Sequence, residues 1–516
     1  MGFYDVGVLF VIAAVANRGL DEGNIVSVEM LSELTCVSRT CAKVTHVKIS
    51  VPLYSHTRTI LEFCKRLAHL HQDIHITCIN PTVKSSCNDV KALFENLPPN
   101  IDSMFLPPVN LDDMPEKPHI PILVHATITS SLPSIYNALK TLHCSSNSIG
   151  LTSIVVDVLI TQVLPMANEL NVLSYVYFSS TAMLLSLCLY PSTFDKTISC
   201  ETVEIPGCML IHTTDLPDPV QNRFRCSEEY KVFLEGNKRF YLADGVIINS
   251  FFDLEPETFR ALQENKGTSS TSIPHVYPVG PLVQEGSCET HESQGNEGET
   301  HEYMRWLDKQ EQNSVLYVSF GSAGTLTHDQ FNELALGLEL SGVKFLWVIR
   351  PPQKLEMIGD LSVGHEDPLE FLPNGFLERT KGQGFVVPYW ADQIEILGHG
   401  AIGGFLCHCG WNSMLESTLH GIPIVAWPLY ADQKMIAALF SDGLKVALRP
   451  KPNEKGIVGR GVVAEVIKNI LVGEEGKEIQ QRMKRLQDVA IDALKEDGSS
   501  TRTITQLALK WKRSAV

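Results

Sequence analysis

The segment Leu406–Ser417, LCHCGWNSMLES, gathers side chains that could bind either a metal ion or an anion. Cys407, His408 and Cys409 are all residue types that zinc accepts as ligands. In a strand, however, successive side chains point to opposite faces, which would separate His408 from both cysteines. No second Cys/His cluster supplies the remaining ligands. We therefore expect no metal here, and metal binding stays the minor alternative.

The same segment also has the pattern of a strand that ends at His408, a tight turn at Gly410 and a helix that opens at Trp411. The free N–H groups and the dipole at the start of such a helix attract an anion. In that interpretation His408, Asn412 and Ser413 add side-chain donors. The alternative is that Asn412 and Ser413 only cap the helix.

A second candidate pair lies far away in the sequence. His56 follows the first expected strand, in VPLYSHTR, and Asp157 closes the strand SIVVD. The carboxyl ends of parallel strands meet at one edge of a sheet, where ligands bind, so we expect both residues to face that edge. For His56 alone, one of seventeen histidines, an ordinary surface position would be the default.

The elements that must position these residues are short apolar strands alternating with amphipathic helices. This pattern predicts an α/β protein with two doubly wound, Rossmann-like parallel sheets and a ligand-binding cleft between them. We expect an atypical N-terminal extension at 1–45, a first domain at 46–281, a linker rich in Glu, Gly, Ser and Thr at 282–302, a second domain at 303–499 and a C-terminal helix at 500–516.

Composition narrows the class of partner. A chain of 516 residues exceeds what one core usually organises, and its formal charge of −17 argues against binding to nucleic acid or an acidic membrane. Thirteen cysteines without regular spacing, and no Asn-x-Ser/Thr acceptor with x other than proline, fit a reducing cytoplasm. The apolar run Val6–Ala16 is too short to span a bilayer. We expect a cytoplasmic protein with a small-molecule partner, and secretion of the chain is the minor alternative.

Several other motifs are absent or incomplete. The chain has no GxGxxG fingerprint, no Walker loop and no Gly-x-Ser-x-Gly elbow. Two Tyr-xxx-Lys matches, Tyr136/Lys140 and Tyr430/Lys434, therefore indicate helical neighbours rather than a dehydrogenase or epimerase. No Asp-x-Asp pair is present to hold a divalent ion against a diphosphate.

The segment Trp390–Gln433, WADQIEILGHGAIGGFLCHCGWNSMLESTLHGIPIVAWPLYADQ, closely resembles the signature of plant secondary-product UDP-glycosyltransferases. The likeness extends over most of the chain from about Lys48 and includes VYPVGPL, LYVSFGS, FLERTKG and EDGSSTR. Within that family the chain looks most like the hydroquinone and monolignol glucosyltransferase branch. The resemblance implies a GT-B fold with the UDP-sugar on the second domain.

The resemblance also implies roles for individual residues of the UDP-sugar site. Uracil and ribose would be contacted by Trp390, Ala391, Gln393 and Glu416. The diphosphate would be held by His408, Asn412, Ser413 and Ser322, and the sugar would lie near Trp411, Asp432 and Gln433, with Tyr430 beside them. In the family, Gln at the last of these positions goes with glucose. An adjacent carboxylate and amide offer sugar hydroxyls both acceptors and donors.

On the acceptor side, the resemblance makes His56 the general base and Asp157 the residue that orients it. It implies direct displacement with inversion by a monomer, without a metal or another cofactor, and with a small phenolic hydroxyl as acceptor. The segments PEKPHIPILV and YFSSTAMLLSLCLYP are apolar and aromatic enough to bind such a ring.

The chain departs from the family pattern at several positions. Asp392 stands where proline is usual and places a carboxylate near the uracil platform, which predicts weaker donor binding. Cys407 replaces Ser or Thr, Ala323 replaces a glycine next to the phosphate, and 189–208 is shorter than in relatives.

A further departure from the family pattern lies directly after His56, the expected general base. Thr57-Arg58-Thr59 replaces an apolar residue and a proline, and a nearby Arg58 would lower the pKa of His56. These departures motivate the alternative of a non-catalytic sugar-nucleotide-binding protein. The intact His56/Asp157 pair favours the enzyme instead.

Overall fold

The computed structural model describes residues 44–51, 53–83, 87–111, 120–144, 151–190, 201–221, 228–264, 273–284, 297–322, 324–352, 367–388 and 390–514. From Val44 onward the chain forms one compact unit that contains two parallel sheets. Residues 1–43 of the expected N-terminal extension lie outside the described residues, as does Ala323.

The first sheet has seven strands in the order β3-β2-β1-β4-β5-β8-β9, and every neighbouring pair is parallel. Its strands are almost continuously apolar, as expected for a sheet that helices cover on both faces; β4, for example, is buried at every position. The strands are β1 (Val44–Ile49), β2 (Ile74–Asn80), β3 (Ile101–Phe105), β4 (Leu151–Asp157), β5 (Leu173–Phe178), β8 (Gly245–Ile248) and β9 (His275–Pro278).

Helices connect these strands, and a two-stranded hairpin joins β6 (Thr202–Val203) to β7 (Ile211–His212). The helix after β1 buries an apolar stripe that includes Ile60, Phe63 and Leu67 against the sheet. The helices are α3 (Tyr54–Leu70), α4 (Cys87–Ala92), α5 (Ile120–Cys144), α6 (Leu164–Glu169), α7 (Ala182–Leu189), α9 (Asp218–Gln221), α10 (Glu228–Arg239) and α11 (Pro256–Glu264).

The second sheet has six parallel strands in the order β12-β11-β10-β13-β14-β15. They are β10 (Val315–Ser319), β11 (Lys344–Ile349), β12 (Gly384–Pro388), β13 (Ile402–Cys407), β14 (Ile424–Ala426) and β15 (Ala447–Leu448). The accompanying helices are α12 (Glu297–Leu307), α13 (His328–Ser341), α14 (Phe376–Arg379), α15 (Gln393–Leu397), α16 (Trp411–His420), α17 (Gln433–Ala438), α18 (Arg460–Val472) and α19 (Glu474–Leu494).

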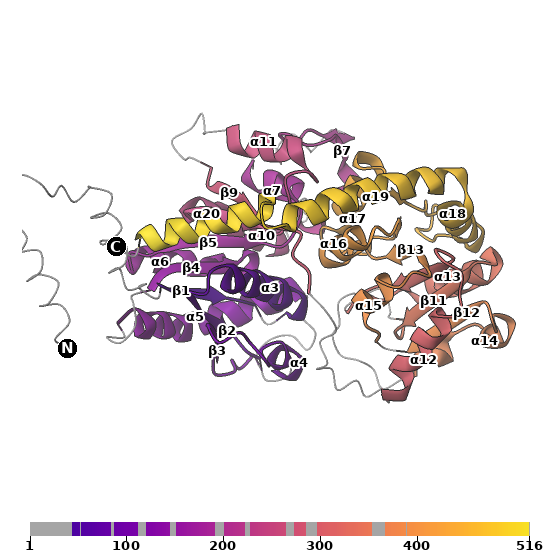
Figure 1. Ribbon diagram of the computed structural model, residues 1–516, viewed down its shortest axis with the longest axis horizontal. Coiled ribbons are helices and arrows are strands. Elements are labelled where there is room, and N and C mark those ends of the chain that lie inside the picture. The colour runs from indigo at the N-terminus through magenta and orange to yellow at the C-terminus, as the bar shows by residue number, and fades with distance from the viewer. Residues whose placement is uncertain are drawn as a thin grey trace, which may run out of the picture. The chain divides into compact units, whose positions relative to one another are not determined.

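The C-terminal helix returns to the first sheet. After α19, helix α20 (Ser499–Ser514) runs across the first half of the chain (Figure 1). Its residues Ile504, Leu507 and Trp511 are buried in the same cluster as Ile74 of β2 and Tyr175 of β5. The C-terminal helix α20 therefore stabilises the domain that contains the first sheet.

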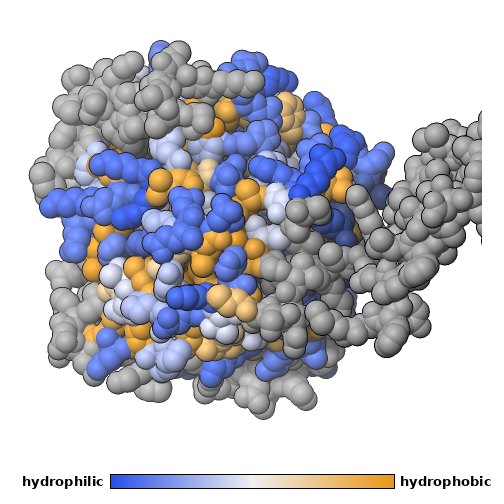
Figure 2. All heavy atoms as spheres, turned by 90° about the vertical axis from the view of Figure 1, so that its left-hand side faces the viewer, coloured by the Kyte–Doolittle hydropathy of each residue, from blue (hydrophilic) through white to orange (hydrophobic). Residues whose placement is uncertain are grey.

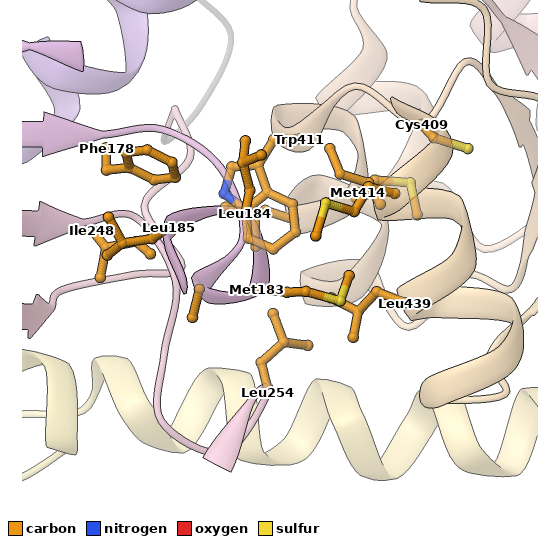
Figure 3. Close-up of a cluster of buried hydrophobic side chains, with 14 of the residues drawn as sticks. Phe178, Met183, Leu184, Leu185, Ile248, Leu254, Cys409, Trp411, Met414 and Leu439 are labelled. Carbon is orange, nitrogen blue, oxygen red and sulfur yellow. The ribbon is translucent and has the colours of Figure 1, made fainter. Parts of the chain in front are cut away.

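One hydrophobic cluster joins the two halves of the chain. It contains Met183 and Leu184 of α7 together with Trp411 and Met414 of α16, and Figure 3 shows these side chains in a single group with Leu439. Because this packing fixes α16 against the first half of the chain, it also sets where the functional edges of the two sheets meet.

The predicted α/β class with two parallel sheets is confirmed. Some boundaries differ from the expectation: β1 begins at Val44, and α12 begins at Glu297, inside the segment 282–302 expected as a linker. The face in Figure 2 mixes hydrophilic and hydrophobic residues. Within the described ranges, no helix is both long enough and apolar enough to cross a bilayer.

Candidate active site

His56 and Asp157 lie in direct contact although they are 101 positions apart in the sequence. Asp157 is the last residue of β4 and is fully buried. Its Oδ1 accepts the Leu159 N–H at 2.9 Å, and its Oδ2 lies 2.9 Å from His56 Nδ1. His56 itself lies in the first turn of α3 rather than at the end of the strand. The backbone bond holds the carboxylate in place, so the carboxylate can fix the orientation of the imidazole.

The surroundings of His56 raise its pKa above 6.5. Burial lowers the pKa, but the charge of Asp157, its hydrogen bond to the ring and the charge of Asp432 raise it by more. The expectation that Arg58 lowers this pKa is wrong, because the Arg58 guanidinium is paired with the Glu416 carboxylate.

The turn before α16 differs in detail from the sequence interpretation. Strand β13 ends at Cys407, one residue before the expected end, and the residue with left-handed backbone is Cys409 (φ 62°) rather than Gly410. Gly410 is the N-cap of α16 and has extended dihedrals. No side chain caps this helix, so the alternative in which Asn412 and Ser413 serve as caps is wrong.

His408 is held between two glycines. A Cβ added at Gly410 would come 2.4 Å from His408 Nε2, and one added at Gly321 would come 2.6 Å from Cε1. Gly321 follows β10 with φ +72°, and sequence reasoning did not single it out. Burial lowers the pKa of His408 to about 4, so the ring is neutral at neutral pH. Its buried Nδ1 has no hydrogen-bond partner among the described residues, which makes this nitrogen a candidate ligand contact.

Gln393 connects the first turns of α15 and α16. Its Nε2 donates to Ser413 Oγ at 2.9 Å and to Glu416 Oε2 at 2.5 Å. Asn412 Nδ2 donates across to the Ser55 carbonyl of α3 at 3.4 Å. Three of the predicted donor-site residues thus form one hydrogen-bonded group, and a fourth contacts the turn that holds His56.

The predicted sugar-side residues take a different arrangement. Trp411 Nε1 donates to the Asn249 carbonyl at 2.7 Å, and the Trp411 ring is buried. The Gln433 side-chain oxygen accepts the N–H groups of Leu429 and Tyr430 at 2.8 and 3.1 Å. These bonds order the loop between β14 and α17.

Asp432 contacts the first half of the chain through Ser180, whose hydroxyl donates to its Oδ2 at 2.5 Å. Burial raises the pKa of Asp432, although this hydrogen bond and the His56 charge oppose the shift. Ser180 lies within the segment YFSSTAMLLSLCLYP, but it was not singled out from the sequence. The rest of that segment includes α7, whose side chains are all buried, and residues 115–119 of PEKPHIPILV lie outside the described residues.

The remaining predicted residues lie on the loops of the second sheet. Trp390 follows β12 and its side chain is 48% exposed, while the neighbouring Ala391 is buried. Ser322, after β10, is exposed. An exposed indole three residues before Gln393 offers a flat surface on which a base can stack.

Comparisons with known proteins identify the family of this chain. The family described as UDP-glucoronosyl and UDP-glucosyl transferase matches residues 276–473. Hydroquinone glucosyltransferase from Rauvolfia serpentina is 43% identical over 472 residues, which cover 90% of this chain and 97% of that protein. The chain belongs to the UDP-glycosyltransferase family.

Solved UDP-glycosyltransferases share the fold over nearly the whole chain. A UDP-glucosyltransferase from Polygonum tinctorium, capable of glucosylating indoxyl and solved with 3,4-dichloroaniline, has a TM-score of 0.81 and 40% identity, covering 92% of this chain and 99% of its own. Phytolacca americana UGT2 complexed with UDP-2fluoro-glucose and pterostilbene has a TM-score of 0.79 and 36% identity, covering 91% of this chain and 99% of its own.

The structure explains several departures of this UDP-glycosyltransferase from the family pattern. Asp392 is the N-cap of α15, and its Oδ1 accepts the N–H groups of Ile394 and Glu395 at 3.0 and 3.1 Å. Thr57 is buried and donates to the Val51 carbonyl at 2.9 Å, and Thr59 donates back to the His56 carbonyl at 3.0 Å. These side chains therefore support local backbone structure.

The structure also describes the two cysteines that flank His408. Cys407 and Cys409 are buried free thiols. In the described part of the chain, no group of three His, Cys, Asp or Glu side chains could hold a metal ion.

Proposed function

We propose that this UDP-glycosyltransferase is an inverting O-glucosyltransferase that transfers glucose from UDP-glucose to a hydroxyl of a small phenolic acceptor of the hydroquinone, monolignol or flavonoid type. The similarity to a hydroquinone glucosyltransferase, and to a structure that holds pterostilbene, supports the phenolic acceptor. The adjacent Asp432 and Gln433 support glucose as the sugar.

The observation that best supports catalysis is the His56–Asp157 contact. The carboxylate accepts the proton on Nδ1, which selects the tautomer with a basic Nε2. In the proposed reaction, the acceptor O–H gives its proton to Nε2 while its oxygen bonds to the anomeric carbon. The bond from that carbon to the diphosphate oxygen breaks, and UDP leaves with the electron pair. One displacement of this kind inverts the anomeric configuration.

The proposed leaving-group site is the start of α16. Because Gly410 provides no side-chain cap, the first N–H groups of a ten-residue helix are available to an anion, and the dipole favours the charge that develops there. The unpartnered Nδ1 of His408, with Asn412, Ser413 and Ser322, would complete the diphosphate site. A neutral His408 would donate a hydrogen bond to the diphosphate and would take no part in the proton transfer.

The nucleoside would lie on the exposed face of Trp390, with Ala391 and Gln393 beside the base and Glu416 accepting from the ribose hydroxyls. On the sugar side, Asp432 is the proposed acceptor of sugar hydrogen bonds. Trp411, Tyr430 and Gln433 would shape the loop around it, since their hydrogen bonds hold this region together.

The domain limits 46–281 and 303–499, the absence of a metal requirement, the monomeric state and the cytoplasmic location stay predictions. Activity that survives EDTA would support the metal-free mechanism, and activity that EDTA abolishes would contradict it.

The deciding experiment is to incubate the purified protein with UDP-glucose and a panel of phenols and to follow UDP release and product mass. We expect a glucoside whose formation is lost in His56→Ala. His69→Ala is the matched control, because His69 lies on the same helix and is exposed. UDP-glucose binding without transfer to any phenol, and with no effect of His56→Ala, would favour the non-catalytic alternative.

A further inference from the structure

Arg58 lies in the first half of the chain and contacts the carboxylate of Glu416, which is proposed above to bind the ribose. It lies in the first turns of α3, two residues after His56, and its Nη2 donates to Glu416 Oε1 of α16. The two residues are 358 positions apart in the sequence. The Arg58 side chain is 20% exposed and that of Glu416 is 1% exposed, so this is a largely buried ion pair.

Both oxygens of the Glu416 carboxylate already accept a hydrogen bond. Gln393 Nε2 donates to Oε2 of Glu416, while Arg58 takes Oε1. Each carboxylate oxygen keeps a further lone pair, but the Glu416 side chain is only 1% exposed while Arg58 lies against it. Glu416 can therefore receive the ribose proposed above only after the Arg58 guanidinium has moved away.

Electrostatics explains why Arg58 stays on Glu416 when no donor is bound. A buried carboxylate without a positive partner is strongly unfavourable, and Gln393 supplies only a neutral donor. The Arg58 guanidinium supplies the missing positive charge. Donor binding must then exchange an ion pair for hydroxyl hydrogen bonds.

We propose that Arg58 is a latch on the donor site, which holds Glu416 in the unliganded protein and must be displaced by the ribose of the UDP-sugar. This inference rests on the proposed role of Glu416 in the function described above. Only molecules with an open latch bind the donor. The apparent donor affinity is therefore the intrinsic affinity multiplied by the open fraction. Because Arg58 and His56 share the first turns of α3, the latch also connects donor occupancy to the segment that holds the catalytic base.

The test compares uridine and UDP as ligands of the full chain by titration calorimetry. Arg58→Met keeps the aliphatic length and removes the charge, and Arg58→Gln is a second neutral variant. We expect both variants to bind uridine and UDP about tenfold more tightly than the wild type, as for a latch that is closed about nine-tenths of the time. Lys65→Met is the matched control: it removes a positive charge from the same helix, where Lys65 pairs with Glu62 of its own helix.

A second measurement separates the latch from a merely structural ion pair. Removing one partner leaves a buried charge, so both Arg58 variants should unfold at a lower temperature than the wild type without ligand. Saturating UDP should raise their unfolding temperature by more than it raises that of the wild type, because binding satisfies Glu416. A variant that loses stability without this larger ligand effect would contradict the latch.

The remaining outcomes are distinct. Weaker UDP binding with unchanged uridine binding in the Arg58 variants would overturn the latch and make Arg58 a diphosphate ligand. Unchanged binding of both ligands would overturn the latch alone. If the wild type and the variants bind neither ligand, the proposed donor site fails, and the latch fails with it.

Discussion

Two histidines stand near the carboxyl edges of the two parallel sheets, and their surroundings move the pKa in opposite directions. His56 lies against the charges of Asp157 and Asp432, which raise its pKa despite burial. His408 lies between Gly321 and Gly410, where burial alone lowers its pKa to about 4. The first ring is suited to accept a proton, and the second is suited to stay neutral and donate.

The difference shows that charged neighbours, rather than residue type or burial, separate the two proposed roles. Burial by itself would lower the pKa of both rings. The edge of the first sheet places the Asp157 side chain against His56. The edge of the second supplies backbone N–H groups and close-packed glycines for binding. Each of the following predictions tests one side of this contrast.

The largest expected effect distinguishes His56, the proposed general base, from His408, the proposed contact to the diphosphate. His56→Ala should lower kcat by about 10²–10⁴-fold, the usual contribution of a general base, and leave UDP affinity nearly unchanged. His408→Ala should instead weaken UDP binding, because it removes a contact to the diphosphate. Steady-state kinetics and UDP titration measure the two effects. Similar losses of kcat and of UDP affinity in both variants would remove the distinction.

A smaller effect is expected from crowding the second histidine. In Gly410→Ala the new Cβ would come 2.4 Å from His408 Nε2 and force the ring to move, although the backbone there accepts alanine. Overpacking of this kind costs about 1–3 kcal/mol, so we expect UDP affinity to fall about tenfold. Gly400→Ala is the matched control, since nothing lies within 4 Å of its Cβ position. Equal UDP affinity in both variants would show that the close packing of Gly410 against His408 is not needed for UDP binding.

The pH profile tests the direction in which the pKa of His56 and the pKa of His408 are shifted. His56 is an active base only when neutral, so kcat/KM should fall as the pH drops through its raised pKa, with the midpoint above 6.5. Asp157→Asn removes a cause of the increase and should move the midpoint to lower pH, besides lowering kcat. UDP affinity should show no step from His408 between about pH 5.5 and 8, because that ring is already neutral there. A midpoint that Asp157→Asn leaves in place would contradict the assignment.

The smallest expected effect concerns a residue outside this contrast. Asp392→Ala removes the N-cap of α15 and should lower the free energy of unfolding by about 1 kcal/mol, as measured by urea denaturation. Asp392→Asn keeps a capping oxygen and should lose less. We expect UDP affinity to change little in either variant, because the carboxylate is bound to backbone N–H groups. Clearly tighter UDP binding in Asp392→Ala would restore the earlier expectation that Asp392 opposes the donor.

The sequence by itself determined the two parallel sheets and the order of their strands along the chain. Local periodicity suffices for this, because apolar strands and amphipathic helices are patterns of near neighbours. It also predicted that α16 would open at Trp411 after an apolar strand, since both elements lie within one short segment. For His56 and Asp157 the residues alone predicted only a shared sheet edge, and it was the family resemblance that implied their direct contact.

Only the tertiary structure decided the partners that give these residues their properties. The Arg58–Glu416 pair joins positions 358 residues apart, and no local pattern could assign that contact. The sequence interpretation placed Arg58 beside His56 and predicted a lowered pKa; the structure turns the guanidinium to α16, and the pKa is raised. A pKa depends on burial and on the sum of nearby charges, and both are set when distant segments pack together.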